Sequence, residues 1–256
     1  MEGLCFLVLW ISWVLVLFWG PGCVLSLMLP DIIEPVFIRR CVQEHNAHRS
    51  RASSPAANMR LMTWDDSLGR GARPLGRHCK SSHNPVLQRV GQSHSDFRQV
   101  GEHIWFGPPF SAFTIESASH TLNKDGVDYT HRNQSCVRVC GHYTQLMWAT
   151  SYKFGCAVHV CSKGIDNFSS HPESTLLVCD YADPGNVFGF PPYVVGLACS
   201  SCGKEKCQDK TCRYDWSPGW DFGPKSSSHR LHHWLTSTGL QMTVGILWLF
   251  YFYAAH

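Results

Sequence analysis

The chain has 256 residues, with 22 Lys and Arg against 19 Asp and Glu, a formal charge of +3, and 13 cysteines. So small a net charge, with no basic patch interleaved with aromatic residues, excludes a nucleic-acid partner from our expectations. Thirteen cysteines argue against a reducing compartment and indicate a disulfide framework formed on the secretory route.

The N-terminal residues have the composition of a signal peptide. Residues 5–18 form an apolar run of the length of an h-region, and Gly20-Pro21-Gly22 and small residues up to Ser26 follow it. We therefore predict that residues 1–26 are a signal peptide that is removed. Glu2 is the only charged residue before the run, so an uncleaved signal anchor is the alternative.

Following the chain, Pro35 opens a stretch in which apolar residues recur at helical spacing, and we predict a helix over 35–49. A second helix should begin at 64–68. Gly69, Gly71, Pro74 and Gly76 follow at once, and a proline inside a helix costs about 3 kcal/mol. We therefore expect this helix to be short or broken.

The middle of the chain is polar and turn-rich apart from an apolar patch at 104–106. We expect a helix near 115–122, paired strands over 143–161, a strand over 173–181 and a turn at 183–186. Asn133 and Asn167 lie in Asn-X-Ser sequons in polar stretches typical of loops, and we predict N-glycosylation at both.

From Cys199 the composition changes to C-x2-C-x4-C-x4-C with few apolar residues. Such a small module needs cross-links to hold its fold. Disulfides fit the secretory route, and a zinc site is the alternative for a C-x2-C cluster. Eleven cysteines lie beyond the signal peptide. One thiol is therefore free, pairs with another chain, or is matched by Cys23.

The C-terminal residues have the composition of a membrane-attachment signal. Residues 213–228 resemble a stalk that ends in three small residues, and 229–256 contain a polar spacer and an apolar run shorter than the roughly 20 residues that cross a bilayer. This order predicts a glycosylphosphatidylinositol signal with attachment at Ser226, Ser227 or Ser228. A short transmembrane tail is the alternative.

Several motifs together resemble one family. Residues 141–149 (GHYTQLMWA) with 154–158 (FGCAV) resemble the G-H-Y-T-Q-x-x-W signature of the CAP superfamily of cysteine-rich secretory, antigen 5 and pathogenesis-related proteins. Residues 178–186 (VCDYADPGN) resemble its second signature. Shorter matches precede these at 45–49, 62–64, 79–83 and 101–105. The branch most similar to the chain is the glioma-pathogenesis-related-like proteins.

This resemblance implies an α+β fold, with an α-β-α sandwich CAP domain over 27–190 and a cysteine-rich hinge module over 191–212. It also implies disulfide pairs that spacing alone leaves open: Cys79 with Cys161, Cys156 with Cys179, Cys199 with Cys207, and Cys202 with Cys212. Cys41, Cys136 and Cys140 would supply one more pair and the odd thiol.

The family's cleft carries two histidines and two acidic residues, and the resemblance assigns His83, His142 and Glu102 to three of these positions. Two neutral imidazoles can bind a divalent metal such as Zn²⁺, and a carboxylate orients a ring through its second nitrogen. The segment compared with the fourth position, 117–123, has no acidic residue, so one is expected to be lost, with His120 as a substitute ligand. The alternative is that both histidines only hydrogen-bond across a polar cleft. Gln145 and Trp148 are expected to pack within a strand.

The resemblance leads to a non-enzymatic, extracellular CAP protein, attached to the outer face of the plasma membrane by its C-terminal anchor. It would act in recognition or adhesion through a cell-surface or extracellular protein partner, gametes included, because relatives occur on sperm. The alternative is a protein that binds sterol or another lipid with a metal-assisted cleft. A hydrolase is the least favoured function, because the motifs show no activated nucleophile.

Overall fold

The computed structural model describes residues 29–213. The predicted signal peptide (1–26), the attachment residues Ser226, Ser227 and Ser228, and the tail 229–256 lie outside the described residues. Between 29 and 213, no helix is long and apolar enough to cross a membrane. In chain order the elements are α2 (Pro35–Arg49), β1 (Thr63–Trp64), α3 (Asp66–His78), η1 (Pro85–Gln88), β2 (Gly101–Pro109), η2 (Phe110–Ala112), α4 (Ile115–Lys124), η3 (Asp125–Asp128), β3 (Tyr129–Thr130), β4 (Ser135–Cys136), α5 (Gly141–Leu146), β5 (Lys153–Cys161), β6 (Ser174–Ala182), β7 (Lys206–Gln208) and β8 (Thr211–Arg213).

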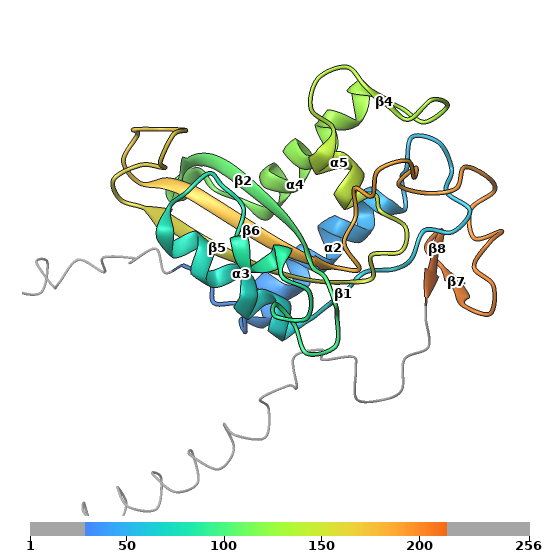
Figure 1. Ribbon diagram of the computed structural model, residues 1–256, viewed down its shortest axis with the longest axis horizontal. Coiled ribbons are helices and arrows are strands. Elements are labelled where there is room, and N and C mark those ends of the chain that lie inside the picture. The colour runs from blue at the N-terminus through green and yellow to red at the C-terminus, as the bar shows by residue number, and fades with distance from the viewer. Residues whose placement is uncertain (1–28, 214–256) are drawn as a thin grey trace, which may run out of the picture.

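The main domain has three layers (Figure 1). Its central sheet has the strand order β1-β5-β6-β2, in which β1 runs parallel to β5 and the other neighbours are antiparallel. The helix α3 packs against β5 and β6 on one face, while α2, α4 and α5 cover the other. This arrangement is the α-β-α sandwich of the predicted α+β class, which is therefore confirmed.

The helix predicted over 35–49 is present as α2. Pro35 stands in its first turn, where a proline costs nothing because that turn leaves its N–H groups unpaired. Its buried residues recur three or four positions apart and form one face against the sheet: Phe37, Ile38, Cys41, His45 and Arg49.

The second helix is continuous, which corrects the prediction of a short or broken one. The carboxylate of Asp65 caps α3 by accepting hydrogen bonds from the amides of Ser67 (2.7 Å) and Leu68 (3.0 Å). Pro74 lies inside the helix on its exposed side, where water can hydrogen-bond the carbonyl that the missing N–H leaves free. The proline therefore does not end the helix.

The glycines that weaken α3 in isolation let it pack closely on the sheet. A Cβ atom on Gly71 would lie 3.0 Å from Oδ2 of Asp180, and one on Gly76 would lie 3.1 Å from Cβ of His159. On the sheet, a Cβ atom on Gly155 of β5 would lie 2.1 Å from the amide nitrogen of Gly69, so a side chain at that position would keep the helix backbone away. This close packing outweighs the helix propensity cost of about 1 kcal/mol per glycine.

The start of the segment predicted as paired strands is helical instead, which is a second correction. α5 covers Gly141–Leu146, and β5 begins only at Lys153. Tyr143, Leu146 and Met147 are buried at helical spacing, and this periodicity carried more information than the aromatic and β-branched content. The predicted helix near 115–122 and strand over 173–181 are present as α4 and β6. The turn predicted at 183–186 lies slightly later in the chain, at 188–189.

Gln145 and Trp148 are buried as predicted, although not within a strand. Gln145 lies on α5 and Trp148 follows that helix. The side-chain oxygen of Gln145 accepts a hydrogen bond from the amide of Gly185 (2.9 Å). Gln145 therefore fastens the segment after β6 to α5.

Five disulfides join ten of the eleven cysteines in the described range. Four are the pairs that the resemblance implies: Cys79–Cys161, Cys156–Cys179, Cys199–Cys207 and Cys202–Cys212. The fifth joins Cys136 to Cys140, so Cys41 is the free thiol. Burial raises the pKa of Cys41, which keeps the thiol protonated and unreactive at neutral pH.

The cysteine module is attached to the main domain through the segment 56–61. The backbone of Cys212 in β8 bonds the carbonyl of Met59 (2.7 Å) and the amide of Leu61 (3.0 Å). Arg60 also forms an ion pair with Glu205 (2.7 Å). The module is therefore held by backbone pairing and an ion pair in addition to its own two disulfides.

Candidate functional site

His83 is held by Glu102. Its Nδ1 lies 2.8 Å from Oε1 of Glu102, which also accepts a hydrogen bond from the amide of Asn84 (3.0 Å). The side chain of His83 is 66% exposed, whereas that of Glu102 is 2% exposed. The hydrogen bond to Glu102 raises the pKa of His83, against an opposing effect of burial. The carboxylate fixes the ring through one nitrogen and leaves Nε2 available.

His142 is held in the same way by Asp125, which corrects the expectation that the second acidic residue is lost. Nδ1 of His142 on α5 lies 2.9 Å from Oδ2 of Asp125. Asp125 stands in η3, immediately after α4 and two residues beyond the segment 117–123. Glu116 is turned elsewhere, since it forms an ion pair with Arg40 of α2.

The two histidine–carboxylate pairs flank β2, an edge strand of the central sheet. Glu102 and His103 are neighbours on this strand, so their side chains point to opposite faces. Glu102 binds His83 on the α3 side, while the ring of His103 packs against that of His142 with centroids 4.5 Å apart. We call the four residues His83, Glu102, Asp125 and His142 the β2-edge site.

His103 is a member of this region that the sequence did not single out. It is buried, its Nε2 has no hydrogen-bond partner, and its ring meets that of His142 edge-on. Burial lowers its pKa well below the ordinary value, and the charges of His142, His45 and His83 add to this effect. His103 is therefore a neutral ring that packs against the ring of His142. The alternation of side chains along β2 was the signal that could have found it.

Asp180 lies beside Glu102 on the neighbouring strand β6, at the paired position of the ladder. Burial raises its pKa well above the ordinary value, with a further contribution from the charge of Glu102. One oxygen of each carboxyl group, Oδ1 of Asp180 and Oε2 of Glu102, is buried without a partner. The raised pKa favours the protonated form of Asp180, which reduces the repulsion between the two carboxyl groups inside the domain.

A ligand-like cluster elsewhere does not fit a metal ion. Among residues 29–213, the ligand atoms of His45, Cys156 and Cys179 are the group of three that lie within 4.8 Å of one another. The two cysteines form a disulfide, and both ring nitrogens of His45 are engaged by the Cys41 carbonyl and the Tyr181 hydroxyl. No thiolate or free imidazole remains to bind a cation.

The β2-edge site has the donor set of a two-imidazole metal site. Each histidine offers a second nitrogen, and each is oriented by a carboxylate, which is how proteins fix metal-ligating histidines. Among residues 29–213, neither histidine belongs to a group of three ligand residues whose donor atoms lie within 4.8 Å of one another. A metal held by His83 and His142 would therefore keep open positions for water or a ligand.

The other residues predicted from the sequence, Asn133, Asn167 and His120, are all exposed. Asn133 and Asn167 are exposed, as attachment of a glycan requires. His120 is exposed on α4, and its charge acts on His48 of α2. Its place does not support the expectation that it substitutes for the fourth residue, since Asp125 already holds His142.

The fold, the paired cysteines and this site define a cysteine-rich secretory type of domain, and sequence comparison agrees. Residues 42–181 match the model of the family "CAP: Cysteine-rich secretory protein family", and the chain belongs to this family. It is 40% identical to bovine (Bos taurus) GLIPR1-like protein 1 over 187 residues, which cover 72% of this chain and 74% of the relative. It is 41% identical to glioma pathogenesis-related protein 1 of Mus musculus, over 72% of this chain and 67% of that protein.

Solved structures share the fold at lower identity. Venom allergen-like protein 4 of Schistosoma mansoni matches with a TM-score of 0.50 and 24% identity, over 62% of this chain and 94% of that one. A structure titled "Crystal structure of NaASP2 with Zn2+" matches with a TM-score of 0.53 and 21% identity, over 73% and 98% of the two chains. At these identities the likeness supports the fold alone.

Proposed function

We propose that the protein is a non-enzymatic extracellular recognition or adhesion module, held on the outer face of the plasma membrane by its C-terminal anchor and acting between cells, gametes included. The observation that carries this proposal is the β2-edge site. Its two accessible imidazoles are each held by a carboxylate, and neither has a hydroxyl or thiol beside it in the described hydrogen bonds. Such a site binds a partner and lacks an activated nucleophile.

The environment of one buried serine also supports a non-enzymatic function. Within residues 29–213, Ser119 is the serine whose hydroxyl contacts a histidine ring, that of His48 at 3.3 Å. Ser119 is 2% exposed, and its hydroxyl donates to the carboxylate of Glu44 (3.2 Å). A carboxylate that accepts directly from the serine does not orient the histidine as a base, and no substrate reaches the hydroxyl. This contact therefore supports a structural role.

The first experiment tests attachment and recognition together. The full chain is expressed on cultured cells and treated with phosphatidylinositol-specific phospholipase C, and we expect the protein in the medium. A variant with Leu at Ser226, Ser227 and Ser228 has no small residue for anchor attachment and should not be released. The released protein is then applied to oocytes and to unrelated cells. Release with selective binding supports the proposal, and absence of both overturns it.

A second candidate, metal-assisted binding of a sterol or other lipid, is favoured by two observations. The β2-edge site offers two carboxylate-oriented imidazoles of the kind that bind a divalent metal such as Zn²⁺, and a structure that shares this fold has zinc in its title. A groove of about 730 Å³ elsewhere on the domain is lined largely by apolar residues, including Phe97, Trp148 and Phe190, and its volume is in the range of small-molecule sites.

Zinc binding is measured by calorimetry on the released protein, and uptake of labelled sterol is measured with and without chelator. We expect His83→Ala/His142→Ala to abolish the zinc signal. His120→Ala, on an exposed histidine of α4, is the matched control and should bind as the wild type does. Sterol uptake that chelator does not change would separate the groove from the metal, and absence of both signals would remove this candidate.

A further inference from the structure

The segment 187–197, which we call the apolar loop, exposes more large apolar side chains than a soluble surface needs. Phe188 is fully exposed at 100%, Leu197 is 81% exposed and Phe190 is 65% exposed. Val187, Val194 and Val195 are each about half exposed. Single exposed apolar residues are ordinary, but a group of this size gathered in one short segment marks an interaction surface.

The apolar loop is fastened to the domain at several points. The buried side chain of Tyr193 anchors its middle. The carbonyl of Pro192 accepts from the amide of Ala149 (2.7 Å), and the carbonyl of Val194 accepts from that of Ala57 (2.8 Å). Because the backbone is fixed on both sides of Tyr193, the exposed side chains are held outward by the fold.

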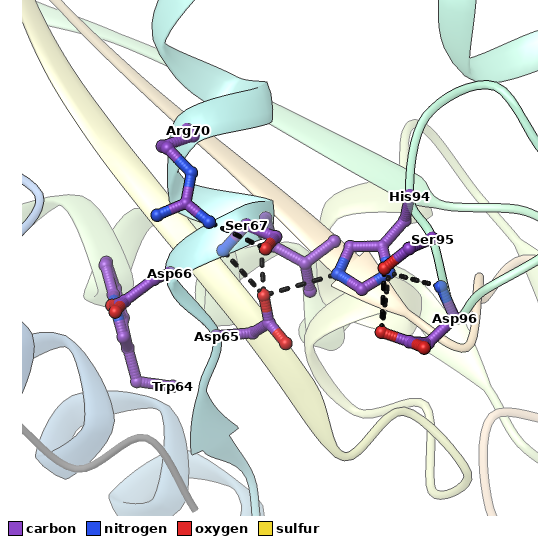
Figure 2. A network of polar contacts seen from close by, with 9 residues as sticks. Trp64, Asp65, Asp66, Ser67, Arg70, His94, Ser95 and Asp96 are labelled. Carbon is purple, nitrogen blue, oxygen red and sulfur yellow. Dashed lines mark hydrogen bonds and ion pairs between the residues drawn. The ribbon is translucent and has the colours of Figure 1, made fainter. Parts of the chain in front are cut away.

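Residues 96–99 also line the 730 Å³ groove, together with residues of the apolar loop. Figure 2 shows how His94 and Asp96 hold the start of this segment. Nδ1 of His94 accepts a hydrogen bond from the amide of Asp96 (3.0 Å). The ring proton is therefore on Nε2, which donates a hydrogen bond to the carboxylate of Asp65 (3.4 Å), the cap of α3. Phe97 then packs on the His94 ring, with centroids 4.8 Å apart. The apolar surface of the loop therefore continues into a groove with rigid walls.

The apolar loop lies at the end of the molecule from which the chain leaves the described domain. The segment 56–61 pairs with both parts: Ala57 bonds Val194 of the loop, and Met59 bonds Cys212 of β8. Figure 1 shows the loop and the β7–β8 hairpin at the same end of the domain. The chain from Arg213 to the predicted attachment serines spans at most roughly 50 Å when fully extended.

We propose that the apolar loop docks on the outer leaflet of the membrane, with Phe188 and Phe190 inserted among the lipids. This inference rests on the membrane attachment proposed above, since a tether of that length holds the loop at high effective concentration next to the bilayer. A bilayer is favoured over a protein partner because Phe188 projects free of the domain. It is not among the residues that line the 730 Å³ groove, and its side chain carries no polar atom that needs a matching group.

The experiment uses the full chain on cells that have incorporated a phosphatidylcholine with a photoreactive acyl chain. After irradiation, lipid-labelled peptides of the purified protein are located by mass spectrometry. We expect label on the peptide that contains 187–197. Phe188→Ser/Phe190→Ser should reduce it by about tenfold or more, because both side chains lose their place in the apolar phase.

Val137→Ser/Val139→Ser is the matched control, because these two valines are also exposed, at 79% and 61%, in another segment. It should leave the label on 187–197 unchanged. Equal lipid label on the segment around Val137 and Val139, or no label on 187–197, would each overturn the inference.

Failure of the tether is distinguished by where the protein is found. If the full chain is recovered in the medium, the proposed attachment is wrong, and the secreted protein is floated with phosphatidylcholine vesicles. Flotation that Phe188→Ser/Phe190→Ser abolishes and Val137→Ser/Val139→Ser preserves would sustain docking by the loop alone. Absence of flotation would overturn it. Both pairs are at exposed positions, so neither variant is expected to disturb folding.

Discussion

Polar side chains are used in two contrasting ways in two regions of this domain. At the end of α2, the guanidinium of Arg49 is buried and donates to the carbonyls of Arg60 (2.7 Å), Leu146 (2.8 Å), Trp148 (2.8 Å) and Ser151 (3.0 Å). At the β2-edge site, His83 and His142 are 66% and 46% exposed, and each uses one ring nitrogen.

The contrast distinguishes side chains that stabilise the fold from side chains that are open to a ligand. A polar group whose hydrogen-bonding capacity is used up inside the protein can only hold the fold, and its loss leaves its partners unsatisfied. A group that is oriented by one bond and open at the other atom is arranged for a ligand. We therefore expect substitutions at the end of α2 to act on stability, and those at the β2-edge site to act on binding.

The largest effect on the free energy of unfolding is expected for Arg49→Met. The substitution leaves several buried carbonyls without a donor, and we expect a loss of about 3–5 kcal/mol. Urea unfolding followed by fluorescence measures it. Arg51→Met is the control, because Arg51 is exposed just beyond α2 and its side chain donates to the Ala47 carbonyl (2.9 Å). Its effect should stay within about 0.5 kcal/mol, and similar losses in both variants would contradict the assignment.

His45 should make the domain less stable in mild acid. Burial lowers its pKa to about 3, and the charges of His48 and Arg49 add to this, while the bond to the Cys41 carbonyl opposes it. The unfolded chain takes up a proton near pH 6.5 and the folded chain does not. The stability that His45 contributes is therefore complete above that pH and declines as the pH falls towards 3, by about 2 kcal/mol at pH 5.

His45→Gln tests this dependence, because glutamine is polar and does not titrate. We expect the difference in unfolding free energy between pH 7 and pH 5 to shrink by about 2 kcal/mol relative to the wild type. His103 titrates in the same direction as His45, and Asp180, whose pKa is raised, titrates in the opposite one. Both are present in the two proteins, so the comparison isolates His45. Parallel pH curves would contradict it.

The sequence predicted α2 better than it predicted α3. The spacing of apolar residues from Pro35 onward is visible locally, and α2 follows it. The glycines and Pro74 of α3 argue against a helix only while the chain is taken alone. The helix backbone at Gly69 packs on the sheet because Gly155, 86 positions away, has no side chain in its way, and no local pattern records that contact.

The β2-edge site was predicted in part for a related reason. His83, Glu102 and His142 stand in recognisable motifs, and the structure gives each histidine a carboxylate partner. Asp125 escaped prediction because it lies in η3, beyond the helix that was compared. Its bond to His142 spans 17 residues and depends on how α4 and α5 pack together. Whether the two histidines bind a metal stays a prediction.

The smallest effect on stability, with a clear effect on binding, is expected for Asp125→Ala. Asp125 is partly exposed and supports His142, so we expect less than about 1 kcal/mol of lost stability. If zinc binds at His83 and His142, its affinity should fall about 10- to 100-fold, because the ring loses the carboxylate that orients it. Calorimetry on the released protein measures the affinity.

Asp128→Ala is the matched control for this prediction. Asp128 stands in the same turn η3, but its carboxylate pairs with Arg138 (2.8 Å) and contacts no histidine. Its loss removes the same charge from the same turn and leaves His142 oriented, so the affinity for zinc should not change by the same factor. Equal losses in the two variants would mean that the negative charge of the turn attracts the cation from a distance. Asp125 would then act on zinc through its charge, and its hydrogen bond to His142 would not be what determines the affinity.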